Sequence, residues 1–266
     1  MFGNAIVGVD AIDGYPRGRD ALALAKQLAS RDGRLTLACV VRDVPGEHRT
    51  ALRRLESLRD EGQVDARLLS VDARSVADGL HELAARHGGD LLVIGASRGD
   101  EYDRLVVGYE ARAVIERAPC AVAVAPVGHV SRPPRLTTIG AGYDGSPQSE
   151  RAVALARRLA AERGAELSAF EAVQEPVFVR DPCNPESEVD AYVAQTRGRI
   201  AEVFGVEAHA AVGDTFEELT RYGASIDLLV LGSHTYGPLD RLRSPTIAQR
   251  LAGSPPCPLL VLSSDG

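Results

Sequence analysis

The sequence predicts an α/β protein of two tandem domains, each an open-twisted, five-stranded parallel sheet with helices on both faces. Three observations carry this prediction. Short, continuous apolar runs such as LLVIG alternate with amphipathic helical stretches, which is typical of parallel strands buried on both faces. The same order of segments occurs twice along the chain. The length of 266 residues suits two cores of about 130 residues each.

The first copy is expected to alternate strands and helices and to end in a strand. Its predicted strands span residues 5–10, 34–41, 64–71, 90–95 and 120–125. Its predicted helices span residues 19–32, 47–61, 75–87 and 109–117. The first helix shows the apolar i, i+3 spacing of an amphipathic helix at Leu22, Ala25 and Leu28. Gly33 and Gly164 follow the first helix of each copy, where a left-handed C-cap is expected.

An internal repeat defines the second copy. The stretch ALALAKQLASRDGRLTLACVV aligns with AVALARRLAAERGAELSAFEA at an offset of 131 residues. Asp10 and Asp144 end the first strands at an offset of 134, whereas Gly95 and Gly232 follow the fourth strands at an offset of 137. The first copy therefore carries three extra residues between its first strand and its first helix. A repeat of this length indicates homologous domains rather than a solenoid.

The predicted domains cover residues 1–128 and 136–266, joined by a linker at residues 129–135. The stretch GHVSRPPRL carries the linker, because paired prolines continue neither a strand nor a helix.

Composition excludes several classes of protein. The net charge of −7, with arginines spread along the chain, argues against a nucleic-acid partner. Apolar runs fall short of the ~20 residues of a membrane span, and the start of the chain does not read as a signal sequence, so a cytoplasmic protein is expected. The four cysteines form no C-x-x-C pair, which suits neither a zinc site nor a disulfide framework; we expect buried thiols.

The ends of the first and fourth strands form the candidate site in each copy. Ligands of open parallel sheets bind beyond the carboxyl ends of the strands, where the strand order reverses. If the two strands are neighbours, Asp10 faces the Gly95 loop and Asp144 faces the Gly232 loop. This arrangement suits a nucleoside phosphate, with the carboxylate on base or ribose and loop N–H groups on phosphate.

Two common nucleotide motifs are excluded. A Walker A loop needs Gly-Lys-Ser/Thr, whereas the single lysine, Lys26, lies inside a predicted helix. The turns GVDAIDG and GAGYDGS do not fit the G-x-G-x-x-G fingerprint of a Rossmann fold.

Taken in order, these segments resemble the universal stress protein family as a tandem pair. The resemblance rests on AIVGVD, TIGAGYDGSPQSERAVALA, ADGLHELAARHGGDLLVIGAS, GSHTYGPLDRL, APCAVAVAP and PPCPLLVL. It implies the HUP (adenine nucleotide α-hydrolase-like) fold, a stress-response role, and ATP or AMP with Mg as the ligand, or no ligand. It also implies an intramolecular pseudo-dimer with the last strands near the contact; a homodimer and an unknown protein partner stay open.

ATP-binding members carry G-x-x-G, nine residues, and then G-[ST], and both copies depart from this pattern. In the first copy, the positions are held by Gly95, Arg98, Gly108 and Tyr109.

In the second copy, Gly232, Thr235, Pro245 and Thr246 fall at these positions. Thr235 lacks the conformational freedom of glycine, and Pro245 lacks an N–H for phosphate. Proline suits a helix start, so the alternative is that Pro245 and Thr246 simply begin a helix.

The two aspartates also have an alternative role as helix caps. Ser146 before Pro147 is a natural N-cap, which favours a site role for Asp144. For Asp10, the role in the site and the role as a helix cap are equally favoured. Residues 179–192 are expected to form a Pro-punctuated loop, either a lid or a surface connection.

The second copy keeps more of the motif and is the better candidate site. The candidate nucleotide-binding residues lie at the strand ends and loops of both copies: Asp10, Gly95, Arg98, Gly108, Asp144, Gly232, Ser233, His234, Thr235 and Thr246. The leading hypothesis is a stress-response binding and signalling module with weak or lost adenine-nucleotide binding. The alternatives are a nucleotide switch with slow ATPase activity in the second copy and a purely structural scaffold. Neither a catalytic residue nor a metal ligand is assigned.

Overall fold

The computed structural model describes residues 1–9, 16–42, 46–96, 109–131, 135–173, 185–233 and 245–263. The strands are β1 (Phe2–Val9), β2 (Ala29–Val41), β3 (Arg67–Asp72), β4 (Leu91–Gly95), β5 (Ala121–Ala125), β6 (Thr138–Gly142), β7 (Glu166–Val173), β8 (Glu207–Val212), β9 (Leu228–Gly232) and β10 (Leu259–Leu262). The helices are α1 (Pro16–Leu28), α2 (Glu47–Gly62), α3 (Val76–His87), α4 (Tyr109–Ile115), the 3-10 turn η1 (His129–Ser131), α5 (Pro147–Arg163), α6 (Pro185–Phe204), α7 (Thr215–Gly223) and α8 (Ile247–Gly253).

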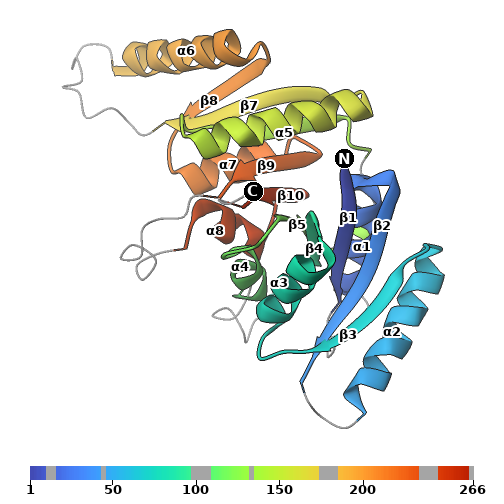
Figure 1. Ribbon diagram of the computed structural model, residues 1–266. Coiled ribbons are helices and arrows are strands. Elements are labelled where there is room, and N and C mark those ends of the chain that lie inside the picture. Colours follow the sequence, from blue (N-terminus) through green and yellow to red (C-terminus); the bar gives the residue numbers. More distant parts are fainter. Residues whose placement is uncertain are drawn as a thin grey trace.

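All ten strands belong to one sheet, in the order β3-β2-β1-β4-β5-β10-β9-β6-β7-β8 (Figure 1). The first half, β1 to β5, and the second half, β6 to β10, are each parallel. The halves join where β5 and β10 pair antiparallel, with Ala123 opposite Leu260. The expectation that the last strands lie at the contact between the copies is thus confirmed. This pairing also covers two apolar edges that would otherwise be exposed to aggregation.

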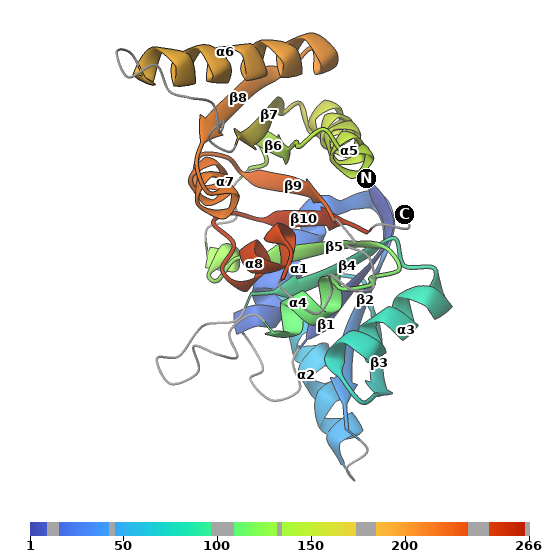
Figure 2. The same ribbon diagram turned by 90° about the vertical axis from the view of Figure 1, so that its left-hand side faces the viewer.

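Helices cover both faces of the sheet, as predicted (Figure 2). One face carries α1, α2, α5 and α6, whose apolar sides pack on alternate strand residues. The other face carries α3, α4, α7 and α8. Both cores run across the junction between the halves, and Gln249 of α8 donates to the carbonyl of Arg112 on α4 at 3.5 Å. The tandem copies therefore share their cores.

The end of α1 differs from the prediction. Residues 29–32 were expected in the helix with Gly33 as its C-cap, but α1 ends at Leu28 and β2 begins at Ala29. Phe2 extends β1 and pairs with Ala29, and the register shifts between Phe2 and Asn4. This pairing pulls the chain into the sheet before Gly33 is reached. In the second half, Gly164 is the expected left-handed C-cap, with φ of 65°.

A second difference concerns the segment predicted as a loop at residues 179–192. Helix α6 begins at Pro185, so residues 185–192 are helical. Proline at the first helical position is favourable because its missing N–H is not needed there. The earlier part of the segment, together with Cys183, lies outside the described residues.

Two aspartates at equivalent positions anchor the first strand of each half. Asp90 accepts hydrogen bonds from the backbone N–H groups of Gly3 and Asn4 at 2.7 and 2.9 Å. Asp227 accepts from the backbone N–H and the hydroxyl of both Thr137 and Thr138, at 2.7–3.1 Å. Partial burial alone would raise the pKa of Asp227, but these bonds outweigh it and hold the pKa below its ordinary value.

The connection between the halves is docked on α1. Asp20, which is 3% exposed, accepts from the backbone N–H groups of Gly128 and Val130, both at 2.8 Å. His129 is 4% exposed and its Nε2 lies 3.0 Å from Oε1 of Gln27. Burial lowers the pKa of His129, although the nearby Asp20 carboxylate opposes this shift. The connection is therefore tied to the first half.

The described cysteines Cys39, Cys120 and Cys257 are buried thiols, as predicted. Burial raises the pKa of Cys120 to about 11 and that of Cys257 to about 12, so both stay as thiols at neutral pH. Among the described residues, no helix is both long and apolar enough to span a membrane.

Candidate functional site

The carboxyl ends of the first and fourth strands are adjacent in both halves. β1 pairs with β4 and β6 pairs with β9, all parallel. The first strand of each half lies between the fourth and the second, so the chain order reverses at this point. The first and fourth strands are therefore neighbours, as the candidate crevice requires, and the crevice lies where open parallel sheets bind ligands.

The crevice of the second half is an open cavity of about 240 Å³. Its inner wall is apolar and is formed by residues of β7, α7, β9 and α8: Phe170, Ala172, Leu219, Leu231 and Ala248. Its polar groups come from the strand ends and helix starts: Asp144, Ser149, Thr215 and Thr246. The inner-wall residues were not predicted from the sequence. Alternation along β7 offers a signal, because Phe170 and Ala172 face the same side of the strand.

Phe170 is held in place from behind. Its ring stacks on Tyr222 with the centroids 4.7 Å apart and the planes 17° apart. The Tyr222 hydroxyl lies 2.6 Å from the Ser168 hydroxyl. Burial raises the pKa of Tyr222 to about 12, so the phenol stays neutral. The aromatic wall of the crevice is thus rigid and uncharged.

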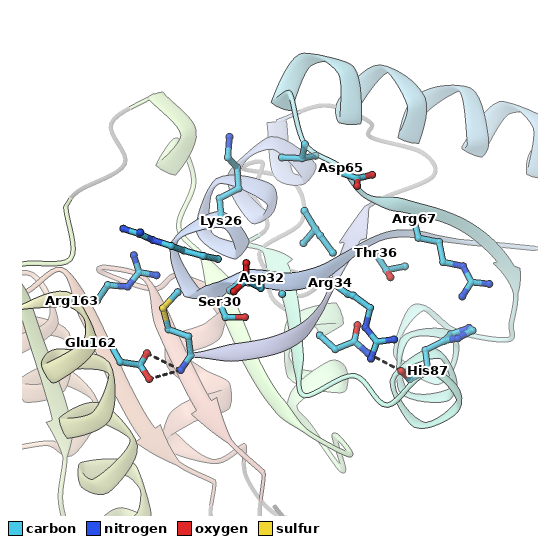
Figure 3. A pocket seen from close by; sticks show the side chains of 17 residues that line it. Lys26, Ser30, Asp32, Arg34, Thr36, Asp65, Arg67, His87, Glu162 and Arg163 are labelled. Carbon is cyan, nitrogen blue, oxygen red and sulfur yellow. Dashed lines mark hydrogen bonds and ion pairs between the residues drawn. The ribbon is translucent and has the colours of Figure 1, made fainter.

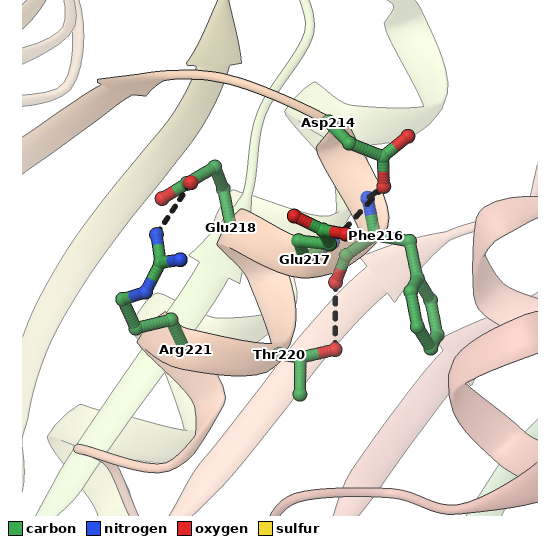
Figure 4. Close-up of polar contacts among 6 residues, drawn as sticks. All are labelled: Asp214, Phe216, Glu217, Glu218, Thr220 and Arg221. Carbon is green, nitrogen blue, oxygen red and sulfur yellow. Dashed lines mark hydrogen bonds and ion pairs between the residues drawn. The ribbon is translucent and has the colours of Figure 1, made fainter.

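Helix α7 supplies the wall residues Thr215 and Leu219 and begins on a side-chain cap (Figure 4). The Asp214 carboxylate accepts from the N–H groups of Phe216 and Glu217 at 3.0 and 3.1 Å. Such a cap stabilises a helix by roughly 1 kcal/mol. The position of this wall is therefore set by the fold and needs no ligand.

Asp144 lies at the mouth of the crevice, exposed, in the turn between β6 and α5. Its Oδ1 accepts from the N–H of Ser146 at 3.0 Å, and its own N–H donates to the Ser149 hydroxyl at 3.3 Å. Ser146 caps α5 by accepting from the N–H of Ser149, with Pro147 in the first turn. The predicted cap is confirmed, and it relieves Asp144 of that role. The turn instead orients the Asp144 carboxylate at the rim.

Close packing explains both Gly232 and Gly95. A Cβ on Gly232 would lie 2.6 Å from the carbonyl oxygen of Gln148, and a Cβ on Gly95 would lie 2.5 Å from that of Arg17. Each glycine thus lets the start of α5 or α1 approach the end of the fourth strand. A close helix approach accounts for both glycines without a phosphate.

Ser233 and Thr246 use their backbone N–H groups inside the protein. The N–H of Ser233 donates to the carbonyl of Leu262 at 3.0 Å. The N–H of Thr246 donates to Oε1 of Gln249 at 2.9 Å, and its hydroxyl accepts from the Gln249 N–H at 3.2 Å. Thr246 begins α8 as its N-cap, as the alternative expects, whereas Pro245 lies one residue before the cap rather than in the first turn. The capping box occupies the N–H groups of Thr246 and Gln249.

The crevice of the first half is nearly closed, at about 30 Å³. That space holds about one or two water molecules. Val40 and Val76 line it where the second half has Ala172 and Thr215. The Gly95 position, the one site candidate of this half within the described residues, lies at its rim.

An ion pair lies in the lining of this crevice. The Arg17 guanidinium lies 3.7 Å from the Glu110 carboxylate, and both residues line the crevice. The equivalent positions of the second half are Gln148 and Ile247. The two halves therefore share a fold but differ in open volume. Five candidates lie outside the described residues: Asp10, Arg98, Gly108, His234 and Thr235.

The described residues contain no cluster of three or more histidine, cysteine, aspartate or glutamate side chains placed to hold a metal ion. Asp144 alone contributes a carboxylate to the described lining of the open crevice. Mg²⁺ that enters with a nucleotide is held by phosphates and one or two carboxylates. Asp144 suits that minor share of the ligands, but it does not form a metal site by itself.

Comparison with known proteins agrees with this architecture. The family model of the universal stress proteins matches twice, at residues 1–126 and 136–263. A provisionally assigned universal stress protein from Pseudomonas aeruginosa UCBPP-PA14 aligns over 100% of this chain and 94% of its own, with a TM-score of 0.71 and 18% identity. A universal stress protein from Archaeoglobus fulgidus DSM 4304 aligns over 97% of this chain and 96% of its own, with a TM-score of 0.64 and 12% identity. The chain therefore belongs to the universal stress protein family and carries two copies of its domain in tandem.

Proposed function

We propose that this protein is a stress-response binding and signalling module whose second half holds one weak site for the nucleoside end of an adenine nucleotide. The observation that carries this proposal is the contrast between the open crevice of about 240 Å³ and the closed crevice of about 30 Å³. Membership of the family supplies the stress-response role, and the contrast supplies the stoichiometry of one ligand per chain.

The lining of the open crevice suits a flat base with polar edges. Phe170, Leu219 and Leu231 offer an apolar wall, and burying an aromatic ring against such a wall is favourable. The Asp144 carboxylate at the rim accepts hydrogen bonds from ribose hydroxyls or an amino group. The volume lies below the ~300–1,000 Å³ of common ligand pockets, so the crevice encloses a nucleoside rather than a whole nucleotide.

The phosphate end has few partners among the described residues. The backbone N–H groups of Ser233 and Thr246 donate hydrogen bonds to Leu262 and Gln249, respectively. Pro245 has no N–H, and Asp144 repels a phosphate. Adenosine has roughly 19 non-hydrogen atoms, and about 0.3 kcal/mol for each gives roughly 6 kcal/mol, or a Kd on the order of 10⁻⁴ M. We therefore expect weak binding with little gain from added phosphates.

We expect no steady ATP turnover, because the described lining presents neither a metal cluster nor a paired general base. The capping box at Thr246 also supports the scaffold alternative, since it gives this residue a role without any ligand. Binding of a nucleoside separates the two hypotheses.

Calorimetric titration with AMP and with Mg-ATP tests the proposal. The double variant Ala172→Val/Thr215→Val copies Val40 and Val76, which line the first crevice at the equivalent positions. It should weaken binding by about tenfold or more, because Ala172→Val adds two methyl groups inside the crevice and Thr215→Val removes a polar group from its lining.

The matched control is Ala211→Val. Ala211 pairs with Ala172 in the β7–β8 register but does not line the crevice. This control should bind AMP like the wild type. Equal binding by the wild type and the double variant would refute the assignment of the site.

A further inference from the structure

A second, larger cavity lies at the opposite end of the strands. It occupies about 1070 Å³ around the amino ends of β1, β2 and β3 and the last residues of α5 (Figure 3). Five side-chain cations line it: Lys26, Arg31, Arg34, Arg67 and Arg163. Three carboxylates line it: Asp32, Asp65 and Glu162. The cavity thus carries an excess of positive charge in a chain whose net charge is −7.

Two of the cations have an ordinary structural reason. Lys26 and Arg163 lie in the last turns of α1 and α5, where a cation complements the helix dipole. Lys26 also donates to the carbonyl of Gly62 at 3.1 Å. Arg34 and Arg67 lie on strands β2 and β3, so this reason does not apply to them.

The second half shows that the fold does not require a cation at these two strand positions. Arg34 pairs with Asn4 just after the register shift between β1 and β2. At the equivalent place in the β6–β7 register, Glu166 pairs with Thr138. The same position of the fold therefore carries opposite charges in the two copies.

The charge is also reversed between the two halves on the next strand, β3 in the first half and β8 in the second. Arg67 pairs with Thr36 between β2 and β3, whereas Glu207 pairs with Ser168 between β7 and β8. Two reversals at neighbouring positions leave the first half with a pair of guanidinium groups and the second half with a pair of carboxylates. The pair of arginines at these two strand positions is specific to the first copy.

The two guanidinium groups share one side of the cavity. Arg34 and Thr36 point to the same face because side chains alternate along a strand, and Arg67 is the register partner of Thr36. Arg34, Arg67 and His87 lie together in Figure 3, across the cavity from Arg163. Within the described part of the chain, neither Arg34 nor Arg67 forms an ion pair.

We propose that this cavity binds a small anion with two or more phosphate groups, held mainly by Arg34 and Arg67. Planar guanidinium groups bind phosphate oxygens in pairs and stay charged at every physiological pH. The cavity is large enough for such an anion, and Lys26 and Arg163 add positive charge from the other side. Asp32 and Asp65 interrupt the positive surface, which disfavours a long polymer such as RNA.

Inorganic tripolyphosphate, titrated calorimetrically at low salt without Mg²⁺, is the probe. We expect one equivalent to bind the wild type and the affinity to fall as salt rises. Arg34→Glu/Arg67→Glu copies the charges of the second half and should weaken binding by about tenfold or more. The control Arg49→Glu/Arg53→Glu makes the same change of charge at exposed positions of α2 away from the cavity, and its affinity should stay within about twofold of the wild type.

Three results would overturn the proposal. One is the absence of saturable binding by the wild type, and another is equal weakening by both double variants, which would indicate net charge alone. The third is loss of binding in Ala172→Val/Thr215→Val, which would place the anion in the nucleoside crevice. Melting by circular dichroism checks folding, and Arg34→Gln/Arg67→Gln replaces the charge-reversal variant if that protein is unfolded; unchanged binding by the Gln variant would also refute the site.

Discussion

Gly232 allows the sharpest test of whether the glycine after the fourth strand serves packing or a ligand. In the variant Gly232→Ala, the new methyl group would lie 2.6 Å from the carbonyl oxygen and 2.7 Å from the carbonyl carbon of Gln148. Both atoms belong to the backbone in the first turn of α5, so a rotamer change cannot relieve the contact. The helix or the strand end must move.

The expected cost follows from this overlap. Inserting one carbon into a well-packed core costs about 1–3 kcal/mol. For a chain of this size, that corresponds to a fall in Tm of roughly 2–10 °C. Gly95→Ala should cost a similar amount, because its Cβ would lie 2.5 Å from the carbonyl oxygen of Arg17.

Gly198→Ala is the matched control. Gly198 is exposed in α6, and a Cβ there would meet no atom within 4 Å. Alanine at this position should stabilise the protein by about 0.5–1 kcal/mol through helix propensity. The assay is urea unfolding of the ligand-free proteins. If Gly232→Ala is as stable as the wild type without ligand, the packing explanation of this glycine is refuted.

Three further predictions concern stability and pH. Asp227→Asn should lower the free energy of unfolding in urea by about 1–3 kcal/mol at pH 7. Because the folded pKa of Asp227 is lowered, its contribution in the wild type is present above about pH 4 and is lost as the pH falls through the folded pKa. A stability that does not change with pH in this acid range, in both proteins, would contradict this. The lowered pKa of buried His129 means that the unfolded state binds the proton more readily, so stability should fall as the pH drops below about 6.5; His129→Gln should reduce this slope, and an unchanged slope would count against it. Thr246→Ala removes the N-cap of α8 and should cost about 0.5–2 kcal/mol by thermal melting without ligand; no loss would show that the capping box contributes little.

Local pattern and the internal repeat were enough to predict most of the fold. The alternation of apolar strands and amphipathic helices predicted both half-sheets, and the resemblance to the universal stress proteins implied that the last strands meet. The error at Gly33 arose because Phe2 extends β1 and draws Ala29 into the sheet, a pairing between distant parts of the chain. The prolines of residues 179–192 predict a loop, but Pro185 instead occupies the first position of α6, where proline is also favourable.

The position of the candidate site was predicted from the sequence, but its open volume was not. Strand ends placed Asp144 and Gly232 at one crevice, and the structure brings both to its lining. The difference in volume between the two crevices depends on side chains that meet only in three dimensions, such as Val40 against Ala172. The helix start at Thr246 was predicted only as an alternative, because a threonine at this position fits both the nucleotide motif and a helix N-cap. The capping box with Gln249 was not predicted.

Calorimetric titration of the wild type with AMP and Mg-ATP, beside Thr235→Gly/Pro245→Gly, shows whether the second half holds a weak nucleoside site. We expect one weak site per chain, with a Kd on the order of 10⁻⁴ M for both ligands. The variant, which restores two glycines of the motif, should gain affinity for Mg-ATP but not for AMP. Two sites per chain, micromolar binding of Mg-ATP by the wild type, or no binding of either ligand by either protein would contradict it.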